Sequence, residues 1–281
     1  MLRIGLPNKG TLSEPAAVML REAGYRQRSD ARDLVLIDPE NEVEFFYLRP
    51  RDIATYVAEG QVEVGITGRD LLLDGGVLAQ EILALDFGRA TFRYAAEHGT
   101  LASLDDLDGR RIATSYPGLV ARDLAQRGVS ADIVRLDGAV ETAIRLGVAE
   151  VVADVVSSGT TLRQAGLVIV GEPLLESEAV LIARDVDTPS AGVELLLRRL
   201  NGVIIARRYV MVEYDIRREA LDEACTITPG IESPTISPLQ DPAWVAVRSM
   251  VPRRDAHAIM DRLQALGARG VIVFDILACR L

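Results

Sequence analysis

The sequence predicts an α/β fold with two similar lobes and a further domain at the C-terminal end, and three observations lead to this prediction. Short apolar runs alternate with helical patterns over roughly the first two hundred residues, which is typical of parallel strands joined by helices. Two stretches of the chain repeat the same order of elements. After Asp185 the pattern changes to closely spaced strands with two helices. The alternative for the first part of the chain is one continuous sheet.

The chain begins with a strand over residues 2–6, followed by the polar turn Pro7–Gly10. A helix capped by Ser13 then runs to about Ala23, and Gly24 ends it. The turn lies at the carboxyl end of the first strand, which is the edge where open α/β sheets bind ligands.

Two later stretches each consist of a strand, a helix, a second strand and a glycine turn that opens another helix. The first contains strand 43–48, helix 51–59, strand 62–66 and turn Thr67–Gly68. The second contains strand 132–136, helix 140–149, strand 151–156 and turn Ser157–Gly159. Such a repeat predicts two similar lobes that face each other across a cleft.

The second lobe is completed by a strand over residues 111–115 and a helix over residues 119–127. A strand over residues 178–183 is expected to return to the first lobe, so that this lobe is discontinuous. We therefore expect the first lobe to comprise residues 1–90 and 181–206, and the second residues 91–180.

Residues 207–281 are expected to form a ferredoxin-like domain, because two helices alternate with strands in a compact unit. A helix over residues 193–200 precedes it. The expected elements are strand 209–214, helix 217–224, a turn-rich stretch over 228–238, strand 244–251, helix 254–266 and strand 270–276.

The composition excludes several classes of function. A net charge of −10 argues against a nucleic-acid or membrane partner, because binding by counterion release requires a basic surface. The two cysteines and two histidines are too few and too far apart for a disulfide framework or a zinc site. The N-terminal residues lack a signal-peptide pattern, and no apolar run approaches a membrane span, so a cytoplasmic location is expected.

The segment from Asp154 to Thr161 has the composition of a phosphate site. A strand that ends in small hydroxyl residues and a glycine, just before a helix, exposes backbone N–H groups and the positive end of the helix dipole. Asp154 is suited to accept hydrogen bonds from sugar hydroxyls nearby, so the segment favours a ribose 5-phosphate. The alternative is an ordinary strand-to-helix turn with a capping serine.

Cations follow two strands of the first lobe. Lys9 is the single lysine among 31 basic residues, which indicates either a coding bias or a position where arginine does not substitute. Lys9 and Arg49 are suited to bind phosphate groups at the carboxyl edge of the sheet, although Arg49 also fits a surface ion pair. Tyr116 follows a strand of the second lobe and fits either a base-stacking or a core position.

A long pattern runs from Glu141 to Leu162, with Glu141, Gly147, Ala149, Val152, Asp154-Val155, Ser158-Gly159 and Thr161-Leu162 at fixed spacing. It resembles the signature of ATP phosphoribosyltransferases, the enzymes of the first step of histidine biosynthesis. Five further segments look like that family in the family's order: Pro7–Gly10, Leu48–Pro50, Gly65–Gly68, Asp137–Glu141 and Glu176–Val180. The segment Pro229–Thr235 is similar to the regulatory domain of the family's long form.

The resemblance implies two lobes of the periplasmic-binding-protein type around a cleft and a C-terminal ferredoxin-like (ACT-like) regulatory domain. It implies a pentosyltransferase that joins ATP to 5-phosphoribosyl 1-pyrophosphate (PRPP), with Mg²⁺, to give phosphoribosyl-ATP and pyrophosphate. It further implies inhibition by L-histidine, AMP as an additional ligand, and homo-oligomers that are dimers or hexamers.

The resemblance also assigns residues to the sites. The catalytic positions are Lys9, Arg49, Glu141 and Asp154. The PRPP- and ATP-binding positions are Gly10, Asp70, Leu71, Tyr116, Val155, Ser157, Ser158, Gly159, Thr160 and Thr161. Histidine is assigned to Asp215, Ile231, Ser233, Thr235 and Gly270, although a Ser-Pro-Thr stretch also fits a plain turn. The magnesium ion is expected on the substrate's pyrophosphate.

Two other functions fit parts of the sequence. A solute-binding protein also has two α/β lobes around a cleft, and a phosphoribosyltransferase for another base also needs a ribose-phosphate site. The lack of a signal-peptide pattern and the full transferase signature argue against the first alternative. The second alternative is distinguished by an assay that compares turnover of ATP with turnover of free adenine.

Overall fold

The computed structural model describes residues 1–280, and within them the chain forms two units. Unit 1 contains Met1–Val18 and Tyr25–Glu194, while unit 2 contains Met19–Gly24 and the chain from Leu195 onward. Each unit has its own sheets and its own hydrophobic core, and each is described by itself below. Among the described residues, no helix combines the length and the apolar character needed to cross a lipid bilayer.

The first sheet of unit 1 has the strand order β2-β3-β1-β4-β11-β5 within the described chain. Its strands are β1 (Leu2–Pro7), β2 (Val35–Asp38), β3 (Val43–Leu48), β4 (Val64–Gly68), β5 (Gln80–Ala84) and β11 (Ala179–Ala183). β1 runs parallel to β3 and β4, whereas β11 is antiparallel to β4 and β5. All residues of β4 and β11 are buried, as expected for apolar runs that helices cover on both faces. The helices of this lobe are α2 (Pro50–Ala58), α3 (Arg69–Gly75) and the first part of α1 (Ser13–Glu22), which belongs to unit 2 from Met19 onward.

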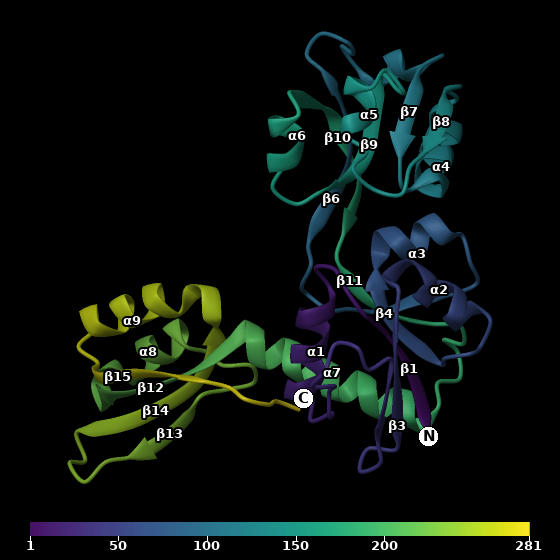
Figure 1. Cartoon of the computed structure of the whole chain (residues 1–281). Helices are drawn as coiled ribbons and strands as arrows, with labels where there is room; N and C mark the ends of the chain where they lie inside the picture. Colours follow the sequence, from purple (N-terminus) through teal and green to yellow (C-terminus); the bar gives the residue numbers. More distant parts are fainter. Residues whose placement is uncertain (281) are drawn as a thin grey trace. The chain divides into compact units, whose positions relative to one another are not determined.

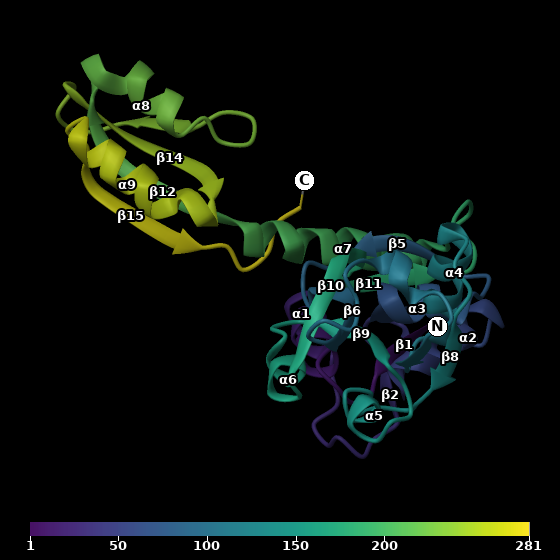
Figure 2. The ribbon, with the colours of Figure 1, turned by 90° about the horizontal axis from the view of Figure 1, so that it is seen from above.

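The second sheet of unit 1 has the order β10-β6-β9-β7-β8 within the described chain. Its strands are β6 (Ala90–Glu97), β7 (Arg111–Thr114), β8 (Asp132–Arg135), β9 (Val151–Val156) and β10 (Leu167–Ser177). β6 and β10 lie side by side in both views of the ribbon (Figures 1 and 2) and pair antiparallel. The helical segments are η1 (Leu104–Leu107), α4 (Pro117–Arg127), α5 (Thr142–Arg145) and α6 (Thr160–Gln164).

The predicted internal repeat is present. β3-α2-β4 in the first lobe corresponds to β8-α5-β9 in the second, and in each sheet a third parallel strand, β1 or β7, lies between the two repeat strands. The two parallel groups belong to separate sheets, so the alternative of one continuous sheet is wrong. The chain crosses between the lobes twice, from β5 to β6 and back from β10 to β11 (Figure 1).

Three helices differ from the sequence-based expectation. The helix expected over residues 217–224 is a 3-10 turn, η2 (Arg218–Ala220), followed by α8 (Leu221–Ile227). The helix expected over residues 140–149 is reduced to α5 (Thr142–Arg145), because Gly147 adopts a left-handed φ of +68° and the Val148 N–H turns back to the Ala143 carbonyl. The helix expected over residues 193–200 extends instead through α7 (Ala191–Arg208). Strands β2, β5, β6 and β10 were not predicted, and their burial in the structure does not follow a strict alternation.

The C-terminal part of unit 2 is an antiparallel sheet in the order β13-β14-β12-β15 within the described chain. Its elements are β12 (Tyr209–Arg217), η2 (Arg218–Ala220), α8 (Leu221–Ile227), β13 (Thr235–Pro238), β14 (Trp244–Pro252), η3 (Arg253–Asp255), α9 (Ala256–Ala265) and β15 (Arg269–Asp275). β12 alternates buried and partly exposed residues, and its buried side packs with α8 and α9 (Figure 1). The predicted ferredoxin-like pattern is therefore confirmed, with β13 inside the stretch predicted as turns.

Candidate active site

A cavity of about 660 Å³ lies where the ends of several strands of unit 1 meet. Eight of the residues predicted from the sequence line it: Lys9, Gly10, Arg49, Asp70, Leu71, Tyr116, Val155 and Ser157. They come from the segments after β1, β3, β4 and β7 and from the end of β9. Parallel strands present their carboxyl ends at one edge, so the two sheets bring residues distant in sequence to one cleft.

The first lobe contributes exposed cations to this cavity. Lys9 lies in the loop after β1, and this loop is tied to the end of β3 because the Asn8 N–H donates to the Leu48 carbonyl at 2.8 Å. Arg28 donates to the Asn8 carbonyl at 2.9 Å and thereby fixes the loop from its other side. Arg49 is the N-cap residue of α2, just after β3. Both predicted cations therefore stand on short loops between anchored elements.

Asp70 is the buried acid of the cavity, with 7% of its surface exposed. The Ser177 hydroxyl donates to Asp70 Oδ1 at 2.7 Å and accepts the Asp70 N–H at 3.1 Å. Ser177 is the last residue of β10, so this pair connects the start of α3 with the strand that returns to the first lobe. The hydrogen bond from the Ser177 hydroxyl offsets part of the cost of burying the carboxylate, and the one from the Asp70 N–H gives a buried backbone donor its partner.

Tyr116 both packs in the second lobe and borders the cavity, so the two readings from the sequence are compatible. Its ring makes an edge contact with Phe92 at a centroid distance of 5.2 Å, and the Arg51 guanidinium lies 5.0 Å from the ring centroid. Burial raises the pKa of the Tyr116 hydroxyl, and the hydrogen-bonded Asp70 carboxylate raises it further. Tyr116 is therefore a neutral hydrogen-bond donor at physiological pH.

Asp154 lies on β9 and is partly buried. Burial raises the pKa of its carboxyl group to about 6, and the negative charges of Glu141 and Asp70 add to this effect. The Val155 N–H donates to Asp154 Oδ1 at 2.8 Å and acts in the opposite direction. Asp154 does not line the cavity among its described residues, but its carboxyl group is electrostatically coupled to Asp70, which does, and to Glu141, which does not. A carboxyl group with such a shifted pKa is typical of a functional site.

The predicted phosphate loop, Ser157–Thr161, joins β9 to α6. Gly159 is the N-cap of α6 with a left-handed φ of +68°, and the hydroxyls of Ser158 and Thr160 are 3.0 Å apart. Arg163 donates to the Thr160 hydroxyl at 3.2 Å. In the described structure Ser157 lines the cavity, whereas Ser158, Gly159, Thr160 and Thr161 lie beyond its lining.

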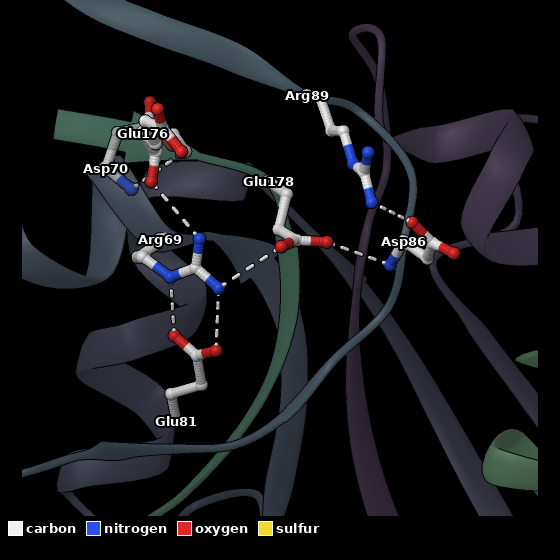
Figure 3. A network of polar contacts seen from close by, with 8 residues as sticks. Arg69, Asp70, Glu81, Asp86, Arg89, Glu176 and Glu178 are labelled. Carbon is white, nitrogen blue, oxygen red and sulfur yellow. Dashed lines mark hydrogen bonds and ion pairs between the residues drawn. The ribbon is translucent and has the colours of Figure 1, made fainter. Parts of the chain in front are cut away.

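A second cavity of about 490 Å³ adjoins the first, because they share the lining residues Ala90, Ser157, Ser177 and Glu178. Beside it lies a network of charged residues at the two chain crossings (Figure 3). Arg69 donates to both carboxylate oxygens of Glu81, at 2.7 and 2.8 Å, and to Glu178. Glu178 in turn accepts the Asp86 N–H at 3.0 Å. Both crossing segments are thus held to the start of α3.

Several lining residues were not predicted from the sequence, above all Arg51, Arg135 and Asp137. Arg51 lies two residues after Arg49, so its place after β3 was a usable signal. Arg135 is the last residue of β8, the strand equivalent to β3, and Asp137 follows it, so the repeat itself pointed to that position. In a sequence with thirty arginines, residue type alone does not distinguish them.

The residues predicted to bind histidine lie in unit 2. Asp215 is on β12 beside Arg269 of β15, which places it near Gly270. Ile231 and Ser233 lie on the exposed loop before β13, and Thr235 begins β13 at the far edge of the sheet. A cavity of about 510 Å³ in this unit is lined by Gly270 together with residues of α9, and none of the other four is among its described lining residues.

The loop that carries Ile231 and Ser233 is anchored at its start. The hydroxyls of Tyr214 and Thr228 are 2.7 Å apart, and the Ser249 hydroxyl donates to the Thr228 carbonyl at 3.0 Å. All three residues are buried. The loop therefore leaves the core at a fixed point, next to the strands that carry Asp215 and Ser249.

Comparison with known proteins relates this arrangement to one family. The sequence model of the family described as "ATP phosphoribosyltransferase" matches residues 49–202. This chain belongs to the ATP phosphoribosyltransferase family. The model described as "HisG, C-terminal domain" matches residues 206–278, so the chain has the long form of the family.

Similar proteins support this family membership over the full length of the chain. A protein of Salinispora tropica named ATP phosphoribosyltransferase is 62% identical over 281 residues, and one of Streptomyces coelicolor is 58% identical over 285 residues. In both alignments 100% of each chain is covered. A solved structure of the ATP phosphoribosyl transferase (HisG:HisZ) complex from Thermotoga maritima matches with a TM-score of 0.63 and 24% identity, covering 73% of this chain and 98% of that one. This likeness supports the fold.

Proposed function

We propose that this chain condenses ATP with PRPP to phosphoribosyl-ATP and pyrophosphate, the first step of L-histidine biosynthesis. The observation that carries the proposal is the cleft of unit 1, where Lys9 and Arg49 of the first lobe face Tyr116, Val155 and Ser157 of the second. Cations on one side and hydroxyl groups next to a carboxylate on the other match a substrate with a pyrophosphate at one end and a ribose 5-phosphate at the other.

The residue roles that the family resemblance implies are part of the proposal. The loop Ser157–Thr161 binds the 5-phosphate, with Asp154 at the ribose hydroxyls and Glu141 beside it. Lys9, Gly10 and Arg49 bind pyrophosphate or triphosphate. Asp70, Leu71 and Tyr116 border the nucleotide, where the neutral Tyr116 hydroxyl donates to Asp70.

The chemistry requires little proton transfer. A lone pair on an adenine ring nitrogen forms a bond to the anomeric carbon of PRPP, while the bond from that carbon to the pyrophosphate oxygen breaks and its electrons leave with pyrophosphate. The attacking nitrogen carries no proton, so no general base is needed for the attack. Catalysis therefore depends on holding the two substrates in line and on offsetting the negative charge that develops on the leaving group.

Magnesium fits this site as a partner of the substrate. The described residues contain no group of three or more His, Cys, Asp or Glu side chains placed to hold a metal ion. Mg²⁺ commonly binds through substrate phosphates and few protein carboxylates, so an ion carried on the pyrophosphate of PRPP suits this cleft. When bound there, it neutralises charge on the leaving group beside Lys9 and Arg49.

The proposed domain organisation assigns residues 1–90 and 181–206 to the first catalytic lobe, residues 91–180 to the second and residues 207–281 to a regulatory domain. L-histidine is proposed to bind the regulatory domain through Asp215, Ile231, Ser233, Thr235 and Gly270, with AMP as a further ligand of the enzyme. A homo-oligomer, a dimer or a hexamer, completes the proposal. The cytoplasmic location stays a prediction.

Release of pyrophosphate tests the activity. The purified chain is incubated with ATP, PRPP and Mg²⁺, and we expect phosphoribosyl-ATP and pyrophosphate in equal amounts. A matched reaction contains free adenine in place of ATP and is expected to give no turnover. Turnover with adenine alone would indicate a phosphoribosyltransferase for another base, and binding without turnover of any base would indicate a solute-binding protein.

Histidine inhibition tests the regulatory assignment. Asp215→Ala is expected to weaken inhibition by L-histidine roughly tenfold, because it removes the carboxylate proposed to pair with a cationic group of the ligand. Asp222→Ala, on the exposed side of α8, is the matched control and is expected to keep the inhibition of the parent. Equal inhibition constants for parent and Asp215→Ala would place the effector elsewhere.

A further inference from the structure

An ion pair of the first lobe contacts the beginning of a helix in the second. Arg51, on α2, and Asp74, on α3, pair at 2.5 Å between Arg51 Nη1 and Asp74 Oδ2. The other oxygen, Asp74 Oδ1, accepts the N–H groups of Gly118 at 2.8 Å and Leu119 at 3.1 Å. The two amides belong to the first turn of α4, so a side chain of one lobe caps a helix of the other.

α4 depends on this contact for its cap. Its N-cap residue, Tyr116, makes no side-chain cap hydrogen bond within the described chain, and Pro117 follows in the first turn. The first amides of a helix have no partner inside the helix and need one from outside. A carboxylate there also interacts favourably with the helix dipole. Separation of the lobes would therefore leave two amides of α4 without the acceptor that they have here.

The same pair fixes Tyr116. The second guanidinium nitrogen of Arg51 donates to the Ser115 carbonyl at 2.6 Å, and the Arg51 guanidinium lies 5.0 Å from the centroid of the Tyr116 ring. Arg51 thus holds the main chain before Tyr116 and touches its ring, while Asp74 holds the helix after it. Tyr116 is clamped from both sides at the edge of the cavity.

The burial of the pair shows that the contact is specific. The Asp74 side chain is 5% exposed and that of Arg51 is 38% exposed. A carboxylate buried to this degree is costly unless its charge is paired and its oxygens are hydrogen-bonded, and here three donors meet that need. Gly118 permits the close approach, because a Cβ there would stand 2.2 Å from the Asp74 main-chain carbonyl oxygen.

We propose that Arg51 and Asp74 are positioning residues that close the first lobe on α4 and hold Tyr116 against the nucleotide. This inference rests on the proposed function, since it uses the nucleotide role given to Tyr116. The pair acts at the base of α4, whereas the 5-phosphate of PRPP is placed at the turn between β9 and α6. Loss of the contact should therefore weaken the binding of ATP more than the binding of PRPP.

Gly118→Ala tests the contact with the least chemical change. The added methyl group meets backbone of the other lobe and must push α3 and α4 apart, while every side chain of the contact is kept. We expect the KM for ATP to rise roughly tenfold and the KM for PRPP to change less than about twofold. The matched control is Gly75→Ala, next to Asp74, where the new Cβ has only ordinary contacts with Val77 at 3.8 and 3.9 Å. The control is expected to keep both KM values.

Amide hydrogen exchange gives a second readout that does not need turnover. In the full chain, Asp74→Ala is expected to speed exchange at the first turn of α4, because Gly118 and Leu119 lose their acceptor. Asp74→Asn keeps a side-chain oxygen for those amides but loses the charge toward Arg51, so we expect it to restore most of the exchange protection and little of the ATP affinity. Asp30→Ala removes an exposed ion pair with Arg32 and is expected to match the parent in both measurements.

The outcomes separate the two hypotheses. Unchanged exchange in Asp74→Ala, or an equal rise of both KM values in Gly118→Ala, would overturn the positioning role. A parent that shows no turnover of ATP with PRPP would refute the proposed function, and the exchange result would still decide whether Asp74 caps α4 across the lobes. ATP, PRPP and Mg²⁺ are the only added ligands in these experiments.

Discussion

The two strand-helix-strand repeats share one backbone arrangement but place different residues at the cleft. In the first lobe, α2 is nine residues long, buries Ile53, Ala54 and Val57, and begins with Arg49 as its N-cap. In the second, α5 is four residues long, and the following strand carries Asp154. This arrangement places strand ends at the cleft in both lobes. The first lobe contributes the cations Lys9 and Arg49 together with the acid Asp70, whereas the second contributes the hydroxyl groups of Tyr116 and Ser157. In the proposed function, the first lobe binds the leaving group and the second binds the sugar phosphate.

Removal of a cation from the first lobe should lower kcat/KM more than any other change described below. Arg49→Ala is expected to lower kcat/KM about 10²- to 10³-fold, because it withdraws a positive charge from the place where negative charge develops. Initial rates of pyrophosphate release at several PRPP concentrations measure the loss. Arg32→Ala is the matched control, since Arg32 is an exposed arginine paired with Asp30. If Arg49→Ala has the rate of the parent, Arg49 does not hold the leaving group.

A side chain added at Gly159, in the phosphate loop of the second lobe, should weaken the binding of PRPP. Gly159→Val is expected to raise the KM for PRPP up to about 10²-fold, because a β-branched residue is strained at a φ of +68° and the new Cβ stands 3.2 Å from Arg163 Nη1. Gly166→Val, at the other end of α6, has a similar φ of +76° with nothing within 4 Å of its Cβ. It controls for backbone strain alone. Calorimetry that finds parent-like PRPP binding to Gly159→Val would refute the phosphate assignment.

The lone lysine is a finer test of the first lobe. Lys9→Arg keeps the charge but exchanges a compact ammonium for a planar guanidinium, so we expect a loss of roughly tenfold in kcat, with the thermal midpoint unchanged. Arg3→Lys, at the opposite end of the same strand, makes the reverse exchange in an exposed ion pair with Glu44 and serves as the control. Full activity of Lys9→Arg would mean that coding bias explains the composition.

Titration of the Asp154 carboxyl group should have the smallest effect on kcat/KM. Its pKa is raised from 3.8 to about 6, so the carboxylate becomes fully available as an acceptor only above that pH. We expect kcat/KM for PRPP in the parent to rise roughly fourfold between pH 5.5 and 7 relative to Asp154→Asn, which removes the titration. The ratio of the two enzymes at each pH cancels the titration of PRPP itself. A ratio that stays constant over this range would contradict the role of Asp154.

The same shift predicts the sign of a stability change. Because the folded chain binds this proton more tightly than the unfolded chain, the contribution of Asp154 to stability is fully present below pH 3.8 and is lost as the pH rises through about 6. Thermal unfolding of parent and Asp154→Asn over this range isolates the contribution of the one carboxyl group.

Regular local patterns made much of the fold predictable. The strands over residues 43–48 and 151–156 were predicted with the bounds that the structure has, because each is a short apolar run between clear turn signals. The helix expected over 140–149 was wrong in length, because the short-range pattern did not show that Gly147 ends the helix early. Predicted residues such as Lys9 and Ser157 line the same cavity, as strand-end positions allow.

The sequence by itself predicted the strand-helix-strand repeat and the ferredoxin-like module, because apolar period, caps and turns act over a few residues. It left one continuous sheet open as an alternative to two lobes, and the sheet topology excluded that alternative. The sequence also determined the family, through the spacing of residues from Glu141 to Leu162. Only the tertiary structure decided that Asp74 of one lobe caps α4 of the other, and that the charges of Glu141 and Asp70 act on Asp154. Burial and charge coupling depend on distances through space, which residues far apart in the chain acquire only when both sheets have formed.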